Sequence, residues 1–394
     1  MILKNTYLFS ILLFFIFTSC KTQTHSVPST KTDKEIQPGA YQLHAYLSLL
    51  DDKNVAIVGN QTSEINRVHL VDTLLSLGVN ITKVFAPEHG FRGQASAGEH
   101  VADSKDKKTG LPIISLYGKH KKPTDEDLED VDILVFDIQD VGARFYTYLS
   151  TLHYVMEAAA ENNLPVIVLD RPNPNGDYID GPVLEKDFSS FVGLHPVPVV
   201  YGMTIGEYAR MIKGEKWLKN GIQPDLLVIP NKNYAHNKKY ILPVKPSPNL
   251  PNQQAIRLYP SLCLFEGTDI SIGRGTDFPF QVYGSPSLPP SDFSFVPQPN
   301  AASKWPKHQG KKCYGKDLRK INPPKELYLE WLIDTYNKYP VKEKYFNKFF
   351  NRLAGNSSLQ KQIKEGLTAG EIKKTWQEEL TKFKKIRKKY LLYP

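Results

Sequence analysis

Short apolar runs recur through the first part of the chain, separated by segments with helical periodicity. The runs are residues 55–58, 81–85, 112–116, 133–136 and 166–169, and each is continuous rather than alternating. Continuous apolar runs are typical of parallel strands that are buried on both faces. Helical patterns lie between them at residues 66–77 and 147–161. The repeated order predicts an α/β fold with a Rossmann-like, doubly wound and mainly parallel sheet.

A cluster of prolines interrupts this pattern. Four prolines within residues 241–251 should end regular structure. We therefore expect a Rossmann-like domain over residues 40–250 and a smaller α+β domain over residues 251–394. The repeated Pro, Ser and Gln of residues 285–310 predict an irregular surface segment. Residues 371–394 predict an amphipathic helix with an apolar stripe formed by Ile372, Trp376, Leu380, Phe383, Ile386 and Tyr390.

The N-terminus has the features of an export signal. Lys4 precedes an apolar run of 12 residues over 7–18, which is too short to span a bilayer, and Cys20 follows the small residue Ser19. This pattern resembles a bacterial lipoprotein signal peptide over residues 1–20, although Phe17 stands where Leu is usual. We expect Cys20 to be lipidated, residues 21–39 to form a flexible tether, and the protein to be exported to the outer membrane, facing the periplasm.

Composition and charge narrow the class of protein. The chain has 394 residues, of which 41% are hydrophobic, so it is long and apolar enough to fold as a globular protein. Cys263 and Cys313 are the only cysteines after the leader, which excludes a disulfide scaffold and a Cys₄ zinc site. The net charge is +9, and residues 371–394 hold eight Lys or Arg against three Glu. We interpret these positive charges as the solvent-exposed face of the predicted helix. The alternative is that they attract an anionic polymer. Nucleic acid is not an expected partner of an exported protein.

Polar side chains follow the predicted strands at their carboxyl ends. In parallel α/β sheets, ligands bind outside these ends. The residues concerned are Asn60, Gln61, Glu88, His89, Tyr117, Asp137, Gln139, Asp140, Arg144, Asp170, Arg171 and Asn173. We therefore predict the functional site at this edge of the sheet.

The sequence lacks the common cofactor and nucleophile motifs. The first strand is followed by Gly59-Asn60-Gln61-Thr62 rather than by a Gly-x-Gly-x-x-Gly loop. A P-loop, a Gly-x-Ser-x-Gly elbow and a His-Glu-x-x-His motif are also missing. We therefore expect no dinucleotide cofactor and no metal, and chemistry based on carboxylates, His, Tyr and Arg.

Seven segments in order resemble the NamZ family of exo-β-N-acetylmuramidases, long catalogued as a domain of unknown function. They are residues 60–62, 87–93, 136–148, 169–174, 201–207, 246–249 and 264–268, and the resemblance covers residues 40–393. It implies a Rossmann-like N-terminal domain, a smaller C-terminal domain, and a cleft between them. It also implies an exo-acting enzyme that removes N-acetylmuramic acid from the non-reducing ends of peptidoglycan fragments.

Glycoside hydrolysis needs a carboxylic acid that protonates the leaving oxygen, and a second carboxylate or the acetamido group of the substrate. Glu88, just after a strand and beside His89, is the candidate general acid/base. His89 is a further catalytic candidate, with the role of an orienting hydrogen-bond partner as the alternative. Asp137 and Asp140 are the first candidates for the second catalytic group, with Asp170 third. Aspartates in such places also cap helices or hold arginines.

Muramic acid carries a lactyl carboxylate, which a guanidinium group fits best. Arg92, Arg144, Arg171 and Arg274 are candidates to bind it, although pairing with Asp137 or Asp170 is the alternative for at least two of them. Glu266 lies with Arg274 in the glycine-rich residues 266–276, which we expect to fold over the carboxyl edge and face Glu88. The remaining candidate substrate-binding residues are Asn60, Gln61, Tyr117, Gln139, Tyr146, Asp170 and Asn173.

Two other functions are compatible with these residues. A lipoprotein could bind muropeptides without catalysis. A phosphate or nucleotide-sugar hydrolase could use the same sheet, and it would need Mg²⁺ held by paired aspartates.

Overall fold

The computed structural model describes residues 34–93 and 103–394. The predicted signal peptide, Cys20 and most of the predicted tether lie outside these residues. Residues 36–394 form one compact unit. Gln37 pairs with Lys232, and the Gly39 amide donates to the Asp170 carbonyl at 2.7 Å, so the fold begins a few residues before residue 40. In the described part of the chain, no helix is long and apolar enough to cross a membrane.

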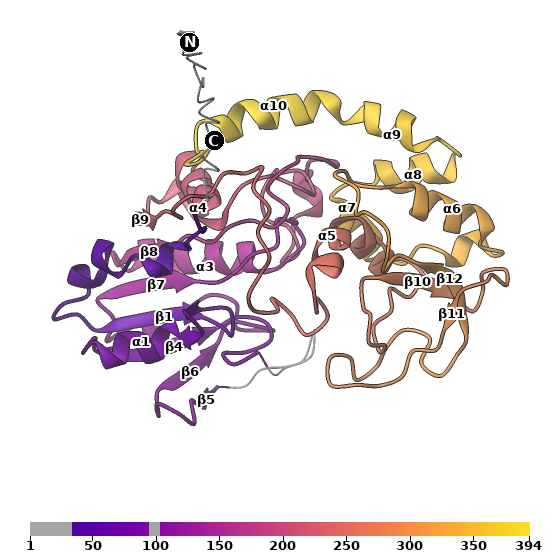
Figure 1. Cartoon of the computed structure of the whole chain (residues 1–394). Helices are drawn as coiled ribbons and strands as arrows, with labels where there is room; N and C mark the ends of the chain where they lie inside the picture. Colours follow the sequence, from indigo (N-terminus) through magenta and orange to yellow (C-terminus); the bar gives the residue numbers. More distant parts are fainter. Residues whose placement is uncertain (1–33, 94–102) are drawn as a thin grey trace, which may run out of the picture. The chain divides into compact units, whose positions relative to one another are not determined.

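The central sheet has seven strands in the order β5-β6-β4-β1-β7-β8-β9, and only β5 is antiparallel to its neighbour (Figure 1). Their bounds are β1 Val55–Gly59, β4 Ile81–Ala86, β5 Ser104–Lys105, β6 Pro112–Ser115, β7 Ile133–Asp137, β8 Pro165–Leu169 and β9 Asp225–Ile229. All five predicted strands are confirmed to within one residue at each end. The order confirms the Rossmann-like, mainly parallel fold class.

Alternate residues of each central strand enter two different cores. In β1, Val55 and Ile57 pack in one apolar cluster with α1 (Leu70–Ser76) and the N-terminal turns, whereas Ala56 and Val58 pack in another with α3 (Tyr148–Glu161) and α4 (Ile205–Gly214). Figure 1 shows α1 and α3 on opposite sides of the sheet. Burial on both faces explains why the sequences of β1, β7 and β8 are apolar at almost every position.

The predicted helix over residues 66–77 is wrong in its first turn. Residues 64–69 form a hairpin of β2 (Glu64–Ile65) and β3 (Val68–His69), and α1 begins only at Leu70. The two turn residues, Asn66 and Arg67, have φ angles of 49° and 68°. Two left-handed residues between short strands make a tight hairpin turn, which interrupts the helical pattern.

The C-terminal region, residues 251–394, contains a small antiparallel sheet and six helices. The sheet order is β10-β12-β11, with bounds Val282–Ser285, Cys313–Asp317 and Ser294–Phe295. The α-helices are α5 Gln253–Leu262, α6 Glu330–Lys338, α7 Phe350–Ala354, α8 Ser358–Lys364, α9 Ala369–Thr375 and α10 Gln377–Lys388. This composition confirms the predicted α+β class of the region, and most of residues 285–310 is irregular, as predicted.

Shorter helices complete the structure. They are α2 Asp125–Leu128 and the 3₁₀ turns η1 Gly39–Tyr41, η2 Leu43–Ala45, η3 Leu47–Leu49, η4 Lys186–Phe188, η5 Lys219–Gly221, η6 Cys263–Gly267 and η7 Lys342–Lys344.

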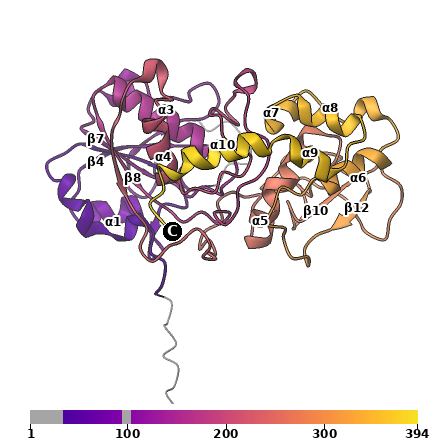
Figure 2. The same ribbon diagram turned by 90° about the horizontal axis from the view of Figure 1, so that it is seen from above.

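The predicted C-terminal helix is two helices, α9 and α10, separated by Trp376. Its predicted apolar stripe is buried at Ile372, Trp376, Leu380 and Phe383. Figure 2 shows α10 running from α9 back toward α4. Arg387 donates to the Gly202 carbonyl, which joins the end of α10 to the N-terminal region.

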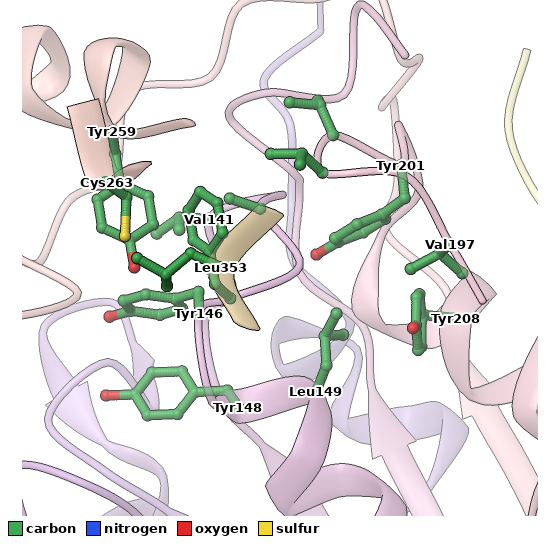
Figure 3. Close-up of a cluster of buried hydrophobic side chains, with 14 of the residues drawn as sticks. Val141, Tyr146, Tyr148, Leu149, Val197, Tyr201, Tyr208, Tyr259, Cys263 and Leu353 are labelled. Atoms are coloured by element: carbon green, nitrogen blue, oxygen red, sulfur yellow. The ribbon is translucent and has the colours of Figure 1, made fainter. Parts of the chain in front are cut away.

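The N-terminal and C-terminal regions share one apolar core. Figure 3 shows Val141, Tyr146 and Leu149 of the N-terminal region in the same cluster as Tyr259, Cys263 and Leu353. Rings from both regions touch, since Tyr146 and Tyr259 have centroids 5.7 Å apart and meet edge to face. Such packing gives the two regions a fixed contact.

Candidate active site

A pocket of about 470 Å³ opens where the two regions meet. The N-terminal region contributes residues that follow β4, β6 and β7, together with a loop: Glu88, Tyr117, Phe145, Thr147, Phe191 and Val192. The C-terminal region contributes Tyr259, Cys263, Glu266, Arg274, Ala302, Ser303, Lys304, Trp305, Phe349 and Leu353. The pocket therefore lies at the carboxyl edge of the sheet, where α/β folds place their ligands.

Glu88 follows β4 and is held by neighbours from other elements. The Thr147 hydroxyl donates to Glu88 Oε2 at 2.9 Å, just before α3 begins. The Tyr117 hydroxyl also interacts with this carboxylate, and burial together with the Glu88 charge raises the pKa of Tyr117 above its ordinary value. Tyr117 thus remains a neutral donor at neutral pH. These contacts fix the orientation of the Glu88 carboxyl group.

The backbone after Glu88 adopts an unusual conformation. His89 and Gly90 have φ angles of 73° and 75°, and His89 is buried rather than lining the pocket. A left-handed conformation is uncommon for a residue other than glycine, and such residues concentrate at functional sites. The placement of His89 suits an orienting role better than a proton-donating one.

Glu266 and Arg274 form an ion pair in the same pocket as Glu88. Arg274 Nε donates to Glu266 Oε1 at 2.7 Å, and the guanidinium lies 5.1 Å from the centre of the Phe280 ring. Burial alone would raise the pKa of Glu266, but Arg274 and Lys307 hold it below its ordinary value. Because the pair uses only the Nε hydrogen, the Nη1 and Nη2 groups can donate to a ligand.

Asp137 and Arg171, predicted as a catalytic and a binding residue, pair with each other in the core. Arg171 Nε and Nη2 donate to the two Asp137 oxygens at 2.5 and 2.8 Å. Neither side chain lines the pocket, and Asp137 is fully buried. The bidentate pair neutralises both charges. The structure therefore assigns these two residues to the frame of the sheet rather than to the substrate.

Asp140 and Asp170 are also buried away from the pocket. Asp140 accepts hydrogen bonds from the Tyr201 hydroxyl and the Gly142 amide, and burial raises its pKa to about 6. Asp170 accepts from Thr204 Oγ1 and from the Tyr393 hydroxyl at 2.7 and 2.5 Å, and burial raises its pKa to about 7. Neither carboxylate lines this pocket, so the structure does not bring them together with Glu88 there.

Arg144 has a structural position as well. It is fully buried and donates to four backbone carbonyls at 2.8–2.9 Å: Pro182 and Val197 in the N-terminal region, and Leu353 and Ala354 in the C-terminal region. Burial lowers its pKa to about 10. Arg144 therefore links the two regions and is not available for a substrate carboxylate.

The other predicted binding residues mostly hold loops at the carboxyl edge. Arg92 pairs with Asp106 at 2.7 Å. Gln61 and Tyr146 donate to the Pro246 carbonyl, Gln139 donates to the Pro172 carbonyl, and Asn173 donates to the Met203 carbonyl. Asn60 donates to the Tyr148 hydroxyl. Irregular loops leave many backbone groups to be satisfied, and these side chains satisfy them. Of the predicted site residues, the pocket brings together Glu88, Tyr117, Glu266 and Arg274.

Several pocket residues were not among the sequence predictions. Thr147 had a recognisable position, since it is the first residue of the helix predicted over residues 147–161. Trp305 also carried a signal, because a tryptophan within a polar, proline-rich surface segment should be exposed. Tyr259 lies in α5 and Cys263 begins η6, and neither position carried such a signal. No group of three or more His, Cys, Asp or Glu side chains that could hold a metal ion occurs within residues 34–93 and 103–394.

Comparison with known proteins covers almost the whole chain. The models of the N-terminal and C-terminal parts of exo-β-N-acetylmuramidase NamZ match residues 55–254 and 257–393. Peptidoglycan β-N-acetylmuramidase NamZ of Bacillus subtilis is 38% identical, over 98% of each chain. Crystal structures of two DUF1343-family proteins of Bacteroides fragilis have TM-scores of 0.86 and 0.78 at 44% and 29% identity, and each match covers 91% of this chain and 99% of the other. The chain belongs to the NamZ family of exo-β-N-acetylmuramidases, which are glycoside hydrolases.

Proposed function

We propose that this protein releases N-acetylmuramic acid from the non-reducing ends of peptidoglycan fragments, with Glu88 as the general acid/base. The observation that supports this most directly is the pocket itself, in which Glu88 shares one cavity with the Glu266–Arg274 pair. A proton donor and a carboxylate-binding guanidinium in one pocket match the two features of a muraminide, its glycosidic oxygen and its lactyl group.

Glu88 would protonate the leaving oxygen and then activate water. Thr147 and Tyr117 hold the carboxyl group, and a fixed donor within hydrogen-bond reach is what general acid catalysis requires. Asp137 and Asp140 are buried outside the pocket, so the second role falls to Glu266 or to the acetamido group of the substrate. Because Glu266 is already engaged by Arg274, we favour the acetamido group.

Arg274 would bind the lactyl carboxylate. Glu266 holds Arg274 through Nε and leaves Nη1 and Nη2 for a second carboxylate. Lys304, in the same pocket, adds positive charge. An N-acetylglucosaminide lacks the lactyl group and would not use the Nη1 and Nη2 donors of Arg274, so the pocket should prefer muraminides.

The test is hydrolysis of a chromogenic β-N-acetylmuraminide and of its β-N-acetylglucosaminide analogue by the full-length protein and by Glu88→Gln. We expect the unmodified protein to cleave the muraminide far faster. Glu88→Gln should fold normally and lose about 10²–10⁴-fold in turnover, because an amide cannot deliver the proton. Muropeptide binding without release of sugar by the unmodified protein would instead identify a non-catalytic binding protein. Undiminished turnover by folded Glu88→Gln would remove Glu88 from the mechanism.

We also propose that Cys20 is lipidated and anchors the protein in the outer membrane, facing the periplasm. The proposal is supported by the leader alone: a short apolar run, small residues and a cysteine, with no acidic pair after it. Mass spectrometry of the N-terminal peptide from membrane fractions should find an acylated Cys20, and Cys20→Ser should abolish that modification. An unmodified N-terminus in the membrane fraction would contradict the anchor.

A further inference from the structure

Among the large hydrophobic residues in the described part of the chain, Trp305 is the most exposed, with 85% of its surface accessible to solvent. Trp331 and Trp376, in contrast, are buried in the core. An exposed indole keeps a large apolar surface in water, which is unfavourable without a compensating role. Trp305 also lines the pocket that contains Glu88 and Arg274. Its exposure therefore places it at the open side of the pocket.

The loop that carries Trp305 is fixed on its N-terminal side. Asn300 Oδ1 accepts hydrogen bonds from the amides of Ala302 and Ser303 at 3.1 and 2.9 Å. Asn249, from the proline-rich connector, donates to the Ala302 carbonyl at 2.8 Å. The turn before Trp305 is thus held both internally and by a second segment.

Contacts on the C-terminal side of Trp305 are equally defined. Lys307 is largely buried and donates to the carbonyls of Phe265, Thr268 and Ile270 at 3.2, 2.5 and 3.1 Å. Those carbonyls belong to the segment that carries Glu266. Trp305 therefore stands on a loop whose backbone is held within two residues on either side in the absence of a ligand.

The same loop is joined directly to Arg274. The Gln298 amide donates to the Gly275 carbonyl at 2.8 Å. A Cβ atom at Gly275 would lie 2.6 Å from Pro306 Cγ, so Pro306 packs against a backbone position that only glycine allows. Because Arg274 and Trp305 each adjoin a member of this contact, they are carried by two loops that pack against each other and line the same pocket.

We propose that the Trp305 indole is a stacking platform for the leaving-group sugar, the N-acetylglucosamine residue attached to the terminal N-acetylmuramic acid. The proposal rests on the proposed function. An exo-acting pocket encloses the terminal sugar, so the next sugar must lie at its mouth. The ring substituents of N-acetylglucosamine are equatorial and leave its faces lined by C–H groups, which fit a flat apolar indole. A neutral sugar also needs no charged partner at this place.

The first test compares two muramic acid substrates that differ only in the leaving group: the β-1,4-linked disaccharide with N-acetylglucosamine, and the β-fluoride, which has no ring to stack. Trp305→Ala should lower kcat/KM for the disaccharide by about 3- to 10-fold, mainly through KM, and leave the fluoride unchanged. Trp305→Phe should retain most of the disaccharide rate. Ile241→Ala, an exposed residue outside this pocket, is the control.

A second test does not depend on hydrolysis. With Glu88→Gln, the disaccharide should protect the exposed tryptophan fluorescence from acrylamide, whereas N-acetylmuramic acid alone should give little protection. Loss of protection in Glu88→Gln/Trp305→Ala would assign the signal to Trp305.

Each remaining outcome overturns the proposal. Equal losses on both substrates would mean that Trp305 contacts the muramic ring or shapes the pocket, while the proposed function would stand. Unchanged rates on both would show that Trp305 does not contact the substrate. If the unmodified protein cleaves neither substrate, the proposed function fails, and absence of disaccharide-specific protection then excludes the platform as well.

Discussion

Replacement of Arg144 by Met tests whether this buried guanidinium holds the two regions together or binds substrate. Arg144 donates to four carbonyls, two in each region, and within residues 34–93 and 103–394 it forms no ion pair with a carboxylate. A hydrogen bond from a charged donor contributes about 1.5–3 kcal/mol. Burial opposes that gain, because it lowers the pKa of Arg144 to about 10.

Arg144→Met would remove a donor from four buried carbonyls, of which that of Val197 still accepts from the Leu184 amide at 3.1 Å. A buried acceptor left without its donor costs about 1–3 kcal/mol, so the three other carbonyls together predict a loss of at least about 3 kcal/mol in the free energy of unfolding. Chemical denaturation followed by circular dichroism measures it. The control is Arg319→Met, whose exposed pair with Asp317 should contribute at most about 1 kcal/mol.

Kinetics separate the structural role from the binding role. At temperatures where Arg144→Met is folded, its preference for muraminide over glucosaminide should equal that of the unmodified protein, since Arg144 does not line the pocket. A denaturation midpoint equal to that of Arg319→Met would refute the structural role. Loss of the muraminide preference in a stable Arg144→Met protein would restore the sequence prediction.

Two further predictions concern recognition and pH. Arg274→Lys should reduce kcat/KM for the muraminide by about 10- to 100-fold and spare the glucosaminide, because lysine cannot form a planar fork; Arg257→Lys, whose pair with Asp177 lies elsewhere, is the control, and equal losses on both substrates would contradict the assignment. His69→Asn should flatten the pH dependence of stability below pH 6.5. Burial lowers the pKa of His69 to about 4, so below pH 6.5 the unfolded chain binds a proton that the folded protein does not, and stability falls by up to about 3 kcal/mol toward pH 4. Asparagine can still cap α1, and parallel stability curves for the two proteins would show that His69 does not titrate in this way.

Two hydrogen bonds of the His69 ring explain why its protonation would destabilise the folded protein. Its Nε2 lies 2.9 Å from the Asn60 carbonyl, and its Nδ1 accepts from the Val71 amide at 3.2 Å. The neutral ring satisfies both contacts. A second ring proton would point at the Val71 N–H group, so protonation must break the cap of α1.

The strands could be predicted from sequence because covered faces leave a continuous apolar signature. β9 was missed because it is an edge strand in which Asp225 and Leu227 are exposed. The hairpin before α1 was missed because its signal is two backbone angles at Asn66 and Arg67, which periodicity does not encode.

The location of the candidate site was predictable, but the roles of its polar residues were not. Topology alone brings the carboxyl ends of the strands to one edge. Whether an aspartate at that edge faces a pocket or an arginine depends on a partner far away in sequence, as Asp137 and Arg171 show. The wall formed by Arg274 and Trp305 depends on irregular loops, whose course follows from individual contacts rather than from a repeating pattern.

Hydrogen bonds from polar side chains to the backbone of loops explain why so many polar residues gather around one pocket. The Pro246 carbonyl accepts from Tyr146 at 2.7 Å, and Asn249, three residues later, holds the loop of Trp305. The connector thus ties the sheet edge that carries Glu88 to the loop wall that carries Arg274. Substitutions of the residues that make these connector contacts should lower stability and reduce turnover on every substrate. They would leave the Glu88 carboxyl group and the Arg274 guanidinium less firmly positioned relative to each other. Substitutions at Glu88, Arg274 or Trp305 should instead change one kinetic constant or one substrate at a time, and this difference separates frame from site.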